Sequence, residues 1–321
     1  GRDLRRGRCY FPKDKLEEVG QTPEHLLDPA VMQRLGGGLL PDVRLLVVAD
    51  NCSDDTAQLA REAGAEVVER HDTRLRGKGY ALDFGVRHLA QRPPEVVIVV
   101  DADCQVGEGA IDCLARRCHE LARPVQSLYL MRAPAGAGLK VQVAEFAWRV
   151  KNLVRPRGWA RLGLPCQLMG AGMAFGWHDL SLINLANGHL VEDVKLGLDL
   201  CQQGKPPAFC PEALVTSQFP LSQQGLNSQR TRWEHGHLGL MLADAPKRAM
   251  AAITQRNASL AALTLDLLVP PLALLVLTLL GLNLVTWLAY LLFGLGYQKM
   301  SGDTGYAYID GSDPYLVNFV Q

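Results

Sequence analysis

The stretch that decides the fold is Glu95-Val96-Val97-Ile98-Val99-Val100-Asp101-Ala102-Asp103-Cys104. Its first six residues are almost all β-branched and apolar, which is typical of a buried strand in a parallel sheet. Two carboxylates follow where this strand is expected to end, and ligands of open α/β sheets bind at the carboxyl ends of strands. Carboxylate oxygens suit Mg²⁺ or Mn²⁺, which often share their coordination shell with phosphate. The stretch therefore predicts a metal–diphosphate site, with helix capping by Asp103 as the alternative.

Composition limits the classes of function. The 321 residues include 33 Lys and Arg and 33 Asp and Glu, so no excess of positive charge indicates nucleic-acid binding. The length allows one large α/β domain and an additional segment. The 8 cysteines include no Cys-x-x-Cys pair, which favours reduced thiols over a disulfide framework or a zinc site.

Strand and helix patterns alternate along the chain, and this alternation predicts βαβ units with a mainly parallel sheet. Strands are expected over residues 43–49, 66–69, 95–100, 125–131 and 173–175. Helices are expected over residues 54–63, 80–90, 110–121, 139–154 and 194–203.

The C-terminal part has a different character, because residues 267–297 include no charged side chain. A membrane span needs about 20 apolar residues. Asp266 and the Pro270-Pro271 pair interrupt the apolar pattern, so we expect an interfacial helix followed by a transmembrane segment. Basic residues before the segment place that side in the cytoplasm; they are Lys247, Arg248 and Arg256. A hydrophobic core hairpin is the alternative.

Four further polar motifs lie in positions where an α/β enzyme could bind its ligands. Asp50-Asn51-Cys52-Ser53-Asp54-Asp55 follows the first expected strand, and Arg76-Gly77-Lys78-Gly79 is a basic turn suited to phosphate. Glu192-Asp193 opens a helix, where both acids also favour the positive helix N-terminus. The motif Gln229-Arg230-Thr231-Arg232-Trp233 precedes the apolar segment and, taken alone, is consistent with an interfacial anchor.

In this order, the motifs resemble those of the family 2 glycosyltransferases, which are GT-A enzymes related to the cellulose, hyaluronan and other exopolysaccharide synthases. The resemblance extends from about Leu40 to the end of the apolar stretch, and its most specific part is the Gln-x-x-Arg-Trp signature at Gln229–Trp233. It implies an α/β fold, in which a GT-A (Rossmann-like, mainly parallel sheet) domain is followed by interfacial and transmembrane helices.

The resemblance implies a metal-dependent, inverting glycosyltransferase of the hexosyltransferase type, active in polysaccharide biosynthesis. Its donor would be a nucleotide-sugar, with a UDP-sugar expected, and its acceptor a glycan or lipid at the cytoplasmic face of the inner membrane. Asp103 would hold Mg²⁺ or Mn²⁺, and Asp193, with Glu192 beside it, would be the catalytic base. The residues implied in nucleotide-sugar binding are Asp50, Lys78, Asp101, Gln229, Arg232 and Trp233. Residues 166–173 would line the acceptor pocket.

The expected organisation has four parts. Residues 1–39 form a diverged or incomplete N-terminal segment, 40–245 the catalytic domain, 246–297 the interfacial and transmembrane helices, and 298–321 a tail of unknown role. No strand is expected before Leu40, although enzymes of this family normally begin with one that holds the uracil. This departure leaves a catalytically silent membrane subunit, which would bind a partner subunit or a lipid, as the alternative function. A nucleotide-sugar pyrophosphorylase fits less well, because it would not need the Gln-x-x-Arg-Trp motif.

Overall fold

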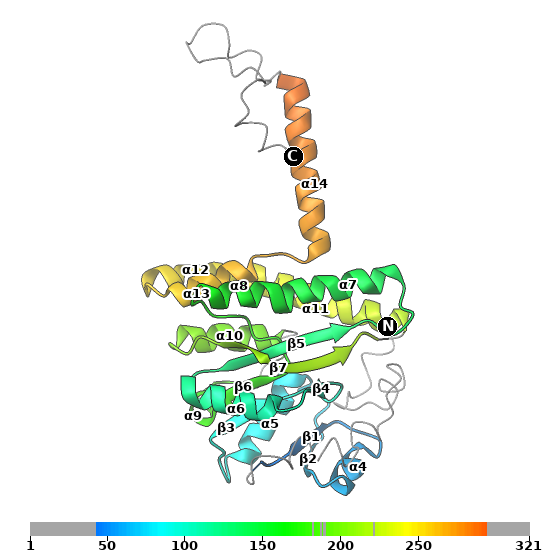
Figure 1. Ribbon diagram of the computed structural model, residues 1–321, viewed down its shortest axis with the longest axis vertical. Coiled ribbons are helices and arrows are strands. Elements are labelled where there is room, and N and C mark those ends of the chain that lie inside the picture. The colour runs from blue at the N-terminus through cyan, green and yellow to red at the C-terminus, as the bar shows by residue number, and fades with distance from the viewer. Residues whose placement is uncertain (1–42, 182, 187, 189–190, 221, 294–321) are drawn as a thin grey trace. The chain divides into compact units, whose positions relative to one another are not determined.

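The computed structural model describes residues 43–181, 183–186, 188, 191–220 and 222–293 (Figure 1). The expectations for residues 1–39 and for the tail 298–321 lie outside the described residues. The strands are β1 Leu46–Asp50, β2 Glu66–Arg70, β3 Val96–Val99, β4 Gln105–Val106, β5 Val125–Arg132, β6 Met173–Gly176 and β7 Ala208–Gln218. The helices before the C-terminal segments are α4 Thr56–Glu62, α5 Lys78–Leu89, α6 Ala110–Leu121, α7 Leu139–Arg149, α8 Arg155–Arg161, α9 Trp177–Ser181 and α10 Glu192–Gln202.

The strands form two sheets. A five-stranded sheet has the order β3-β6-β5-β7-β4, and β1 and β2 form a parallel pair. Within the described residues, β1 pairs only with β2. The five-stranded sheet is mixed: β5 and β7 are parallel, whereas β3, β6 and β4 each run antiparallel to their neighbours. The prediction of a mainly parallel sheet is therefore wrong, because helices between strands do not by themselves set strand direction.

Strand β3 carries apolar side chains on both faces, as its sequence predicts. Val96 and Ile98 pack with α6, whereas Val97 and Val99 pack in the cluster that contains side chains of α5 and α10. Successive side chains of a strand point to opposite faces, so a strand covered on both sides is apolar throughout. β3 is half-buried because it forms one edge of the sheet in the described part of the chain.

Strand β7 was not expected from the sequence, because Pro211 interrupts its pattern. Proline cannot donate to a sheet ladder and is confined to edges and bulges. The register between β5 and β7 shifts at this point, between Ser127 and Leu128 of β5. The irregularity accommodates the proline and lets the strand continue to Gln218.

A layer of helices covers the face of β5 and β7 opposite α6 (Figure 1). The predicted helix 139–154 continues further: α7 passes through the π-helical turn η2 Val150–Val154 into α8. The remaining members are α11 Gln223–Ala243, α12 Ala245–Thr254 and α13 Ala258–Leu267. Leu198 and Cys201 of α10 pack with Leu260 and Leu263 of α13 in one buried cluster.

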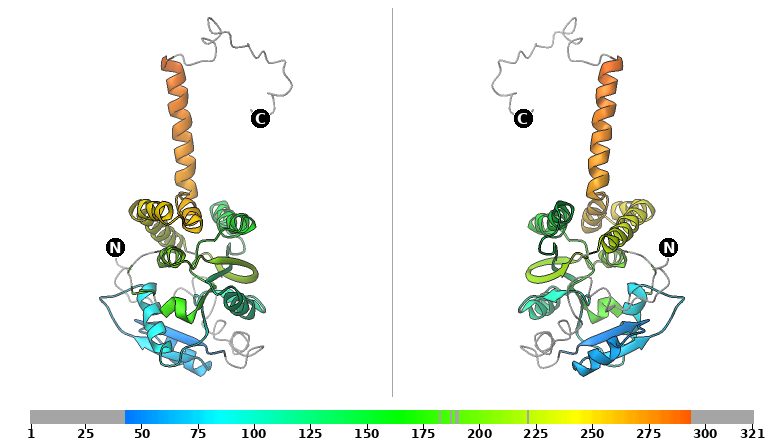
Figure 2. Two further views of the ribbon diagram at one scale, coloured as in Figure 1. Left: turned by 90° about the vertical axis from the view of Figure 1, so that its left-hand side faces the viewer. Right: turned by 90° about the vertical axis from the view of Figure 1, so that its right-hand side faces the viewer.

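The C-terminal unit, which begins at Pro270, contains α14 Leu272–Phe293, drawn in orange in Figure 2. Its window Leu274–Leu291 has a mean hydropathy of 2.0 and none of it is buried. The side-chain hydroxyls of Thr278 and Thr286 donate to the carbonyls of Leu274 and Leu282, so these polar groups are satisfied within the helix. Length and composition make α14 the one described helix able to cross a membrane, which is weak evidence for a span.

The described cysteines match the expectation of reduced thiols except at one position. Six of them are free, namely Cys104, Cys113, Cys118, Cys166, Cys201 and Cys210. Cys52 is disulfide-bonded, so the expectation is wrong there.

Candidate functional site

Four segments that are distant in sequence meet around the ammonium group of Lys78. Its Nζ lies 2.5 Å from Asp101 Oδ1, 2.6 Å from the carbonyl oxygen of Gly170, and 3.9 Å from Glu192 Oε1. Burial lowers the pKa of Lys78, but the two carboxylates outweigh this effect and raise its pKa above the usual value. A permanently charged lysine therefore holds together the end of β3, the loop before β6 and the start of α10.

The local sequence explains why Lys78 reaches this position. Gly77 precedes α5 with φ +133°, a conformation that side-chain-bearing residues rarely adopt, and the helix begins at Lys78. The basic turn predicted from Arg76-Gly77-Lys78-Gly79 is confirmed as the entry to a helix. The Nε of Arg76 in the same turn is buried and has no hydrogen-bond partner among the described residues.

Two acidic side chains open α10, as predicted, and their environment favours the protonated form. Burial and the neighbouring charge of Asp193 raise the pKa of Glu192 to about 7. Burial also raises the pKa of Asp193, although Lys78 opposes this shift. A carboxylate with a raised pKa is a stronger proton acceptor than a solvated one, so the pair can take up a proton near neutral pH.

The loop before β6 approaches these carboxylates through glycine. Gly170 has φ +92°, and a Cβ at this position would lie 3.3 Å from Asp193 Oδ2. Gln126, which is fully buried on β5, fixes the loop: its Oε1 accepts from Met169 N at 2.8 Å and its Nε2 donates to Ala171 O at 2.9 Å. Sequence reasoning missed Gln126, since its partners lie more than forty residues away.

Asp101 and Asp103 lie in the turn after β3, where the sequence places them. Asp101 O accepts from Cys104 N at 3.0 Å, and Asp103 Oδ1 lies 3.7 Å from Cys104 Sγ. Both aspartates are half-buried. The described residues contain no cluster of three or more metal-ligating side chains. One or two carboxylates still fit Mg²⁺ or Mn²⁺, because such an ion takes its remaining ligands from phosphate and water.

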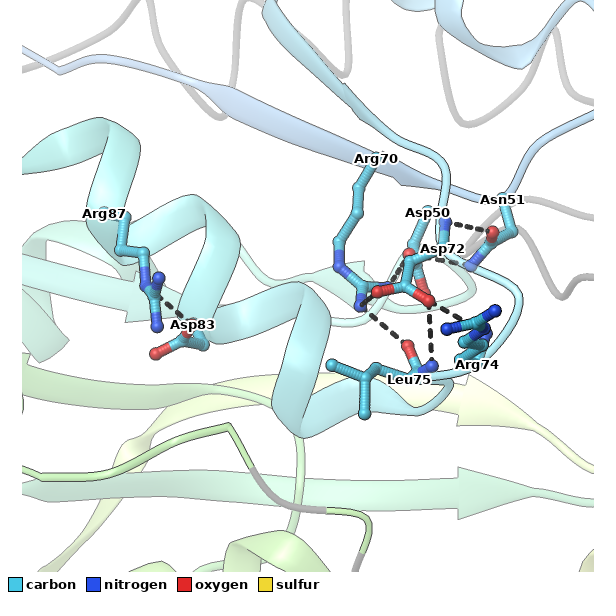
Figure 3. Close-up of polar contacts among 8 residues, drawn as sticks. All are labelled: Asp50, Asn51, Arg70, Asp72, Arg74, Leu75, Asp83 and Arg87. Carbon is cyan, nitrogen blue, oxygen red and sulfur yellow. Dashed lines mark hydrogen bonds and ion pairs between the residues drawn. The ribbon is translucent and has the colours of Figure 1, made fainter.

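Asp50 is not part of this cluster. Figure 3 shows it at the end of β1, where its buried Oδ1 accepts from Arg70 at 2.7 Å and from Asn51 at 3.0 Å. Arg70 also donates to Leu75 O, and Asp72 Oδ1 accepts from the backbone of Arg74 and Leu75. Within the described structure, Asp50 thus organises the loop that leads into the basic turn.

The Gln-x-x-Arg-Trp residues lie on α11. The ring of Trp233 lies 4.8 Å from that of Trp148 on α7, and it packs against the cluster that contains Cys104 and Ala171. Trp233 is therefore linked by packing to the segments that carry Asp103 and Gly170. Gln229 and Arg232 are half-buried on the same helix. Of the predicted site residues, the structure brings Lys78, Asp101, Glu192 and Asp193 into one cluster.

The chain is similar to one protein family and to several solved structures. The model of the family described as "Glycosyltransferase like family 2" matches residues 24–236. The mannosyltransferase PcManGT from Pyrobaculum calidifontis, solved with GDP-Man and Mn²⁺, has 16% identity and a TM-score of 0.53, covering 86% of this chain and 78% of that one. Glucosyl-3-phosphoglycerate synthase from Mycobacterium tuberculosis, solved with Mn²⁺, UDP-Glc and phosphoglyceric acid, has 23% identity and a TM-score of 0.46, covering 68% of this chain and 75% of that one.

No match was found among curated proteins. The family model nevertheless spans more than half of the 321 residues, and the structural likeness to the mannosyltransferase is one of fold. The chain therefore belongs to glycosyltransferase family 2: it is a GT-A glycosyltransferase that takes its sugar from a nucleotide-sugar donor.

Proposed function

We propose that this glycosyltransferase inverts the anomeric centre of its donor sugar, using Asp193 as the general base and a divalent cation at Asp103. The observation that carries the proposal is the cluster around Lys78, in which an ammonium, Asp101 and the Glu192–Asp193 pair converge from separate segments. Such a cluster combines a cation for a diphosphate with a proton acceptor, which are the two groups that sugar transfer requires.

The transfer step follows from these roles. An acceptor hydroxyl attacks the anomeric carbon from the face opposite the diphosphate and gives its proton to the Asp193 carboxylate. The new carbon–oxygen bond forms as the bond to the diphosphate oxygen breaks, and the bonding electron pair leaves with the nucleoside diphosphate. Attack from the opposite face inverts the anomeric configuration.

Metal and donor binding fall to the other predicted residues. Asp103, with Asp101 nearby, would hold Mg²⁺ or Mn²⁺, and the bound ion supplies a Lewis acid that neutralises the leaving diphosphate. The Mn²⁺ and nucleotide-sugar in the complexes of PcManGT and of glucosyl-3-phosphoglycerate synthase are in line with this proposal. Lys78 would neutralise the nucleotide, and Asp50 would contact the base or ribose. Gln229, Arg232 and Trp233 would close over the pyrophosphate and the acceptor.

We also propose that the enzyme works at the cytoplasmic face of the inner membrane on a glycan or lipid acceptor. The helical layer carries exposed apolar side chains that suit a membrane interface, among them Phe146 on α7, Ile253 on α12 and Leu265 on α13. The apolar helix α14 is in line with an anchor. Three basic residues before the apolar segment are predicted to orient it in the membrane. One of them, Arg248, forms ion pairs with Asp199 and Asp244. The other two, Lys247 and Arg256, are exposed.

The proposal is tested by measuring nucleotide release from UDP- and GDP-sugars by the membrane fraction, with and without Mn²⁺. We expect Mn²⁺-dependent release from one donor, with an anomeric configuration in the product opposite to that of the donor. Asp103→Asn should abolish Mn²⁺-dependent donor binding in calorimetry. Unchanged affinity would remove Asp103 from the metal site, and no release from any donor would favour the silent-subunit alternative.

A further inference from the structure

The outer side of the helical layer, which faces away from the sheet, exposes large apolar side chains. On α7, Leu139, Val143 and Phe146 follow the i, i+4, i+7 spacing of a single helix face, and Phe146 is 66% exposed. The other face of α7 packs over β5 and β7 in a buried cluster. On α12, Met250 and Ile253 are also exposed. The layer therefore has a second apolar surface besides the one that it packs on the sheet.

The exposed charges of the same helices have one sign. Within α7, η2, α8, α12 and α13, every exposed charged side chain is basic, namely Lys140, Arg149, Lys151, Arg157, Arg161 and Lys247. The acidic residues of these helices are the half-buried Glu145, which pairs with Arg149, and the buried Asp266, which pairs with Arg155. Because the whole chain has equal numbers of acidic and basic residues, this concentration of cations is a local property of the layer.

The helix on the other side of the sheet lacks this combination. α6 exposes Arg116 and Arg117 together with the acidic Glu120, and it exposes no large apolar side chain. Arg117 and Glu120 form an ion pair on this helix. The joint exposure of apolar and basic side chains therefore distinguishes the helical layer from α6.

Apolar and basic side chains in one surface fit the surface of an anionic bilayer. On an interfacial helix the apolar side chains enter the boundary of the acyl region, while Lys and Arg remain at the level of the headgroups. Anionic headgroups attract each cation near the membrane surface. A nucleic-acid backbone would bind the cations but leave aliphatic side chains such as Leu139 and Ile253 without a partner. The pattern therefore favours lipid over nucleic acid.

The chain connection also favours lipid. α13 ends at Leu267 and the apolar helix α14 begins at Leu272, so only residues 268–271 separate them. Leu268 and Val269 in this connection are themselves exposed apolar residues. The apolar character of the layer thus continues along the chain into the segment that is proposed to anchor it.

We propose that the outer side of the helical layer binds a bilayer surface that contains anionic phospholipid, with α7, η2 and α8 as the main contact. The inference rests on the membrane location in the proposed function. It goes further by naming the lipid and by assigning membrane contact to residues 139–161, which belong to the catalytic domain. Phe146 inserts among the lipids, and Arg157 and Arg161 pair with their phosphates.

The test uses the full chain with Phe146 replaced by the photo-crosslinking residue p-benzoylphenylalanine. It is reconstituted into vesicles of phosphatidylcholine alone or with about 30 mol% phosphatidylglycerol. Flotation confirms that the chain is in the vesicles, and mass spectrometry after irradiation measures the fraction that carries phospholipid. We expect about threefold more lipid adduct with phosphatidylglycerol than without it. The same photo-crosslinking residue in place of Arg116 on α6 measures the background.

Charge reversal tests whether the layer cations cause the preference. Arg157→Glu combined with Arg161→Glu should abolish the gain from phosphatidylglycerol. Arg116→Glu combined with Arg117→Glu is the matched control, because it reverses two exposed cations on α6 and should retain the gain. In the parent, about 1 M salt should remove the gain by screening. The melting temperature of each variant shows that the fold is intact.

Equal adduct yields with and without phosphatidylglycerol, in a chain that floats with both vesicles, would overturn the inference. Equal effects of the two double variants would also overturn it. Crosslinking of position 146 to a second copy of the chain instead of lipid would show that the surface is an interface between copies, with the same consequence. A chain that floats with neither kind of vesicle would contradict the membrane location itself, so failure of the inference and failure of the proposed function are distinguishable.

Discussion

Lys78 Nζ lies 2.5 Å from Asp101 Oδ1, an ion pair that joins the start of α5 to the end of β3. The same nitrogen donates to Gly170 O, so one ammonium group fixes both the carboxylate and the loop that faces Asp193. This relationship explains how carboxylates from separate segments are held close together.

Replacing Lys78 should therefore weaken donor binding. Lys78→Met leaves Asp101 and Glu192 without their cation, and a charge-assisted hydrogen bond contributes about 1.5–3 kcal/mol. We expect the Kd of the nucleotide-sugar with Mn²⁺ to rise roughly 10- to 100-fold, as measured by calorimetry. Lys195→Met is the control, because Lys195 is a lysine on α10 that pairs with Asp199 instead of the cluster. Equal affinities of the Lys78→Met and parent proteins would contradict the role of Lys78.

Gly170→Ala should impair turnover more than donor binding. The new Cβ would stand 3.3 Å from Asp193 Oδ2 in a backbone conformation with φ +92°, so the loop and the base must move apart. Gly136→Ala is the control, because Gly136 also has a positive φ, +76°, but a Cβ there would have no atom within 4 Å. This variant therefore has the backbone strain without a contact to a carboxylate. We expect kcat to fall at least tenfold more in Gly170→Ala than in Gly136→Ala. Similar losses in the two variants would show that strain alone is responsible.

The transfer rate should fall as the pH drops through about 7, where the buried pair takes up a proton. Asp193 can accept a proton only when it is ionised. Because its pKa is raised, Asp193 becomes protonated, and the rate falls, at a higher pH than for an ordinary aspartate. Glu192→Gln removes one of two adjacent carboxylates, so the acidic limb of kcat should move to lower pH. Profiles of kcat against pH from 5 to 9 measure this, and a parent profile that stays flat down to pH 5 would contradict it.

The chain should sediment with membranes and resist extraction by alkaline carbonate, because α14 is about 33 Å long and apolar. Leu282→Arg puts a charge near the middle of α14 at a cost of about 2.5–3.5 kcal/mol, whereas Tyr290→Arg puts it near the end at a smaller cost. We expect carbonate to release Leu282→Arg more readily than Tyr290→Arg. Recovery of the parent chain in the high-speed supernatant without detergent would refute the anchor.

Local sequence signals place Lys78, Asp101 and Glu192 correctly in the fold, because each stands just after a strand or at the start of a helix. Asp101 follows an apolar run, Lys78 lies in a glycine turn, and Glu192 begins an amphipathic segment. These local signals place the residues at edges of elements, where an α/β fold brings them together.

The features that the sequence did not predict depend on contacts between distant segments. The antiparallel direction of β6 is set by its pairing with β3 and β5, and β7 continues through Pro211 only because β5 pairs on both sides of the register shift. In the sequence, Gln126 is an isolated polar residue in a strand. Its role is visible only in the fold, where it accepts a hydrogen bond from Met169 N in a distant loop. Asn152 lies in a π-helical turn that the periodicity of residues 139–154 does not reveal.

The central claim is that Asp193 accepts the acceptor's proton, and the most direct test is the Asp193→Asn variant. Its nucleotide-sugar affinity with Mn²⁺ and its transfer rate are measured on the same preparation. Because general-base catalysis contributes about 10²–10⁴-fold, we expect the rate to fall by that factor while the donor Kd remains near that of the parent. An unchanged rate, or loss of donor binding in a folded variant, would contradict this role for Asp193.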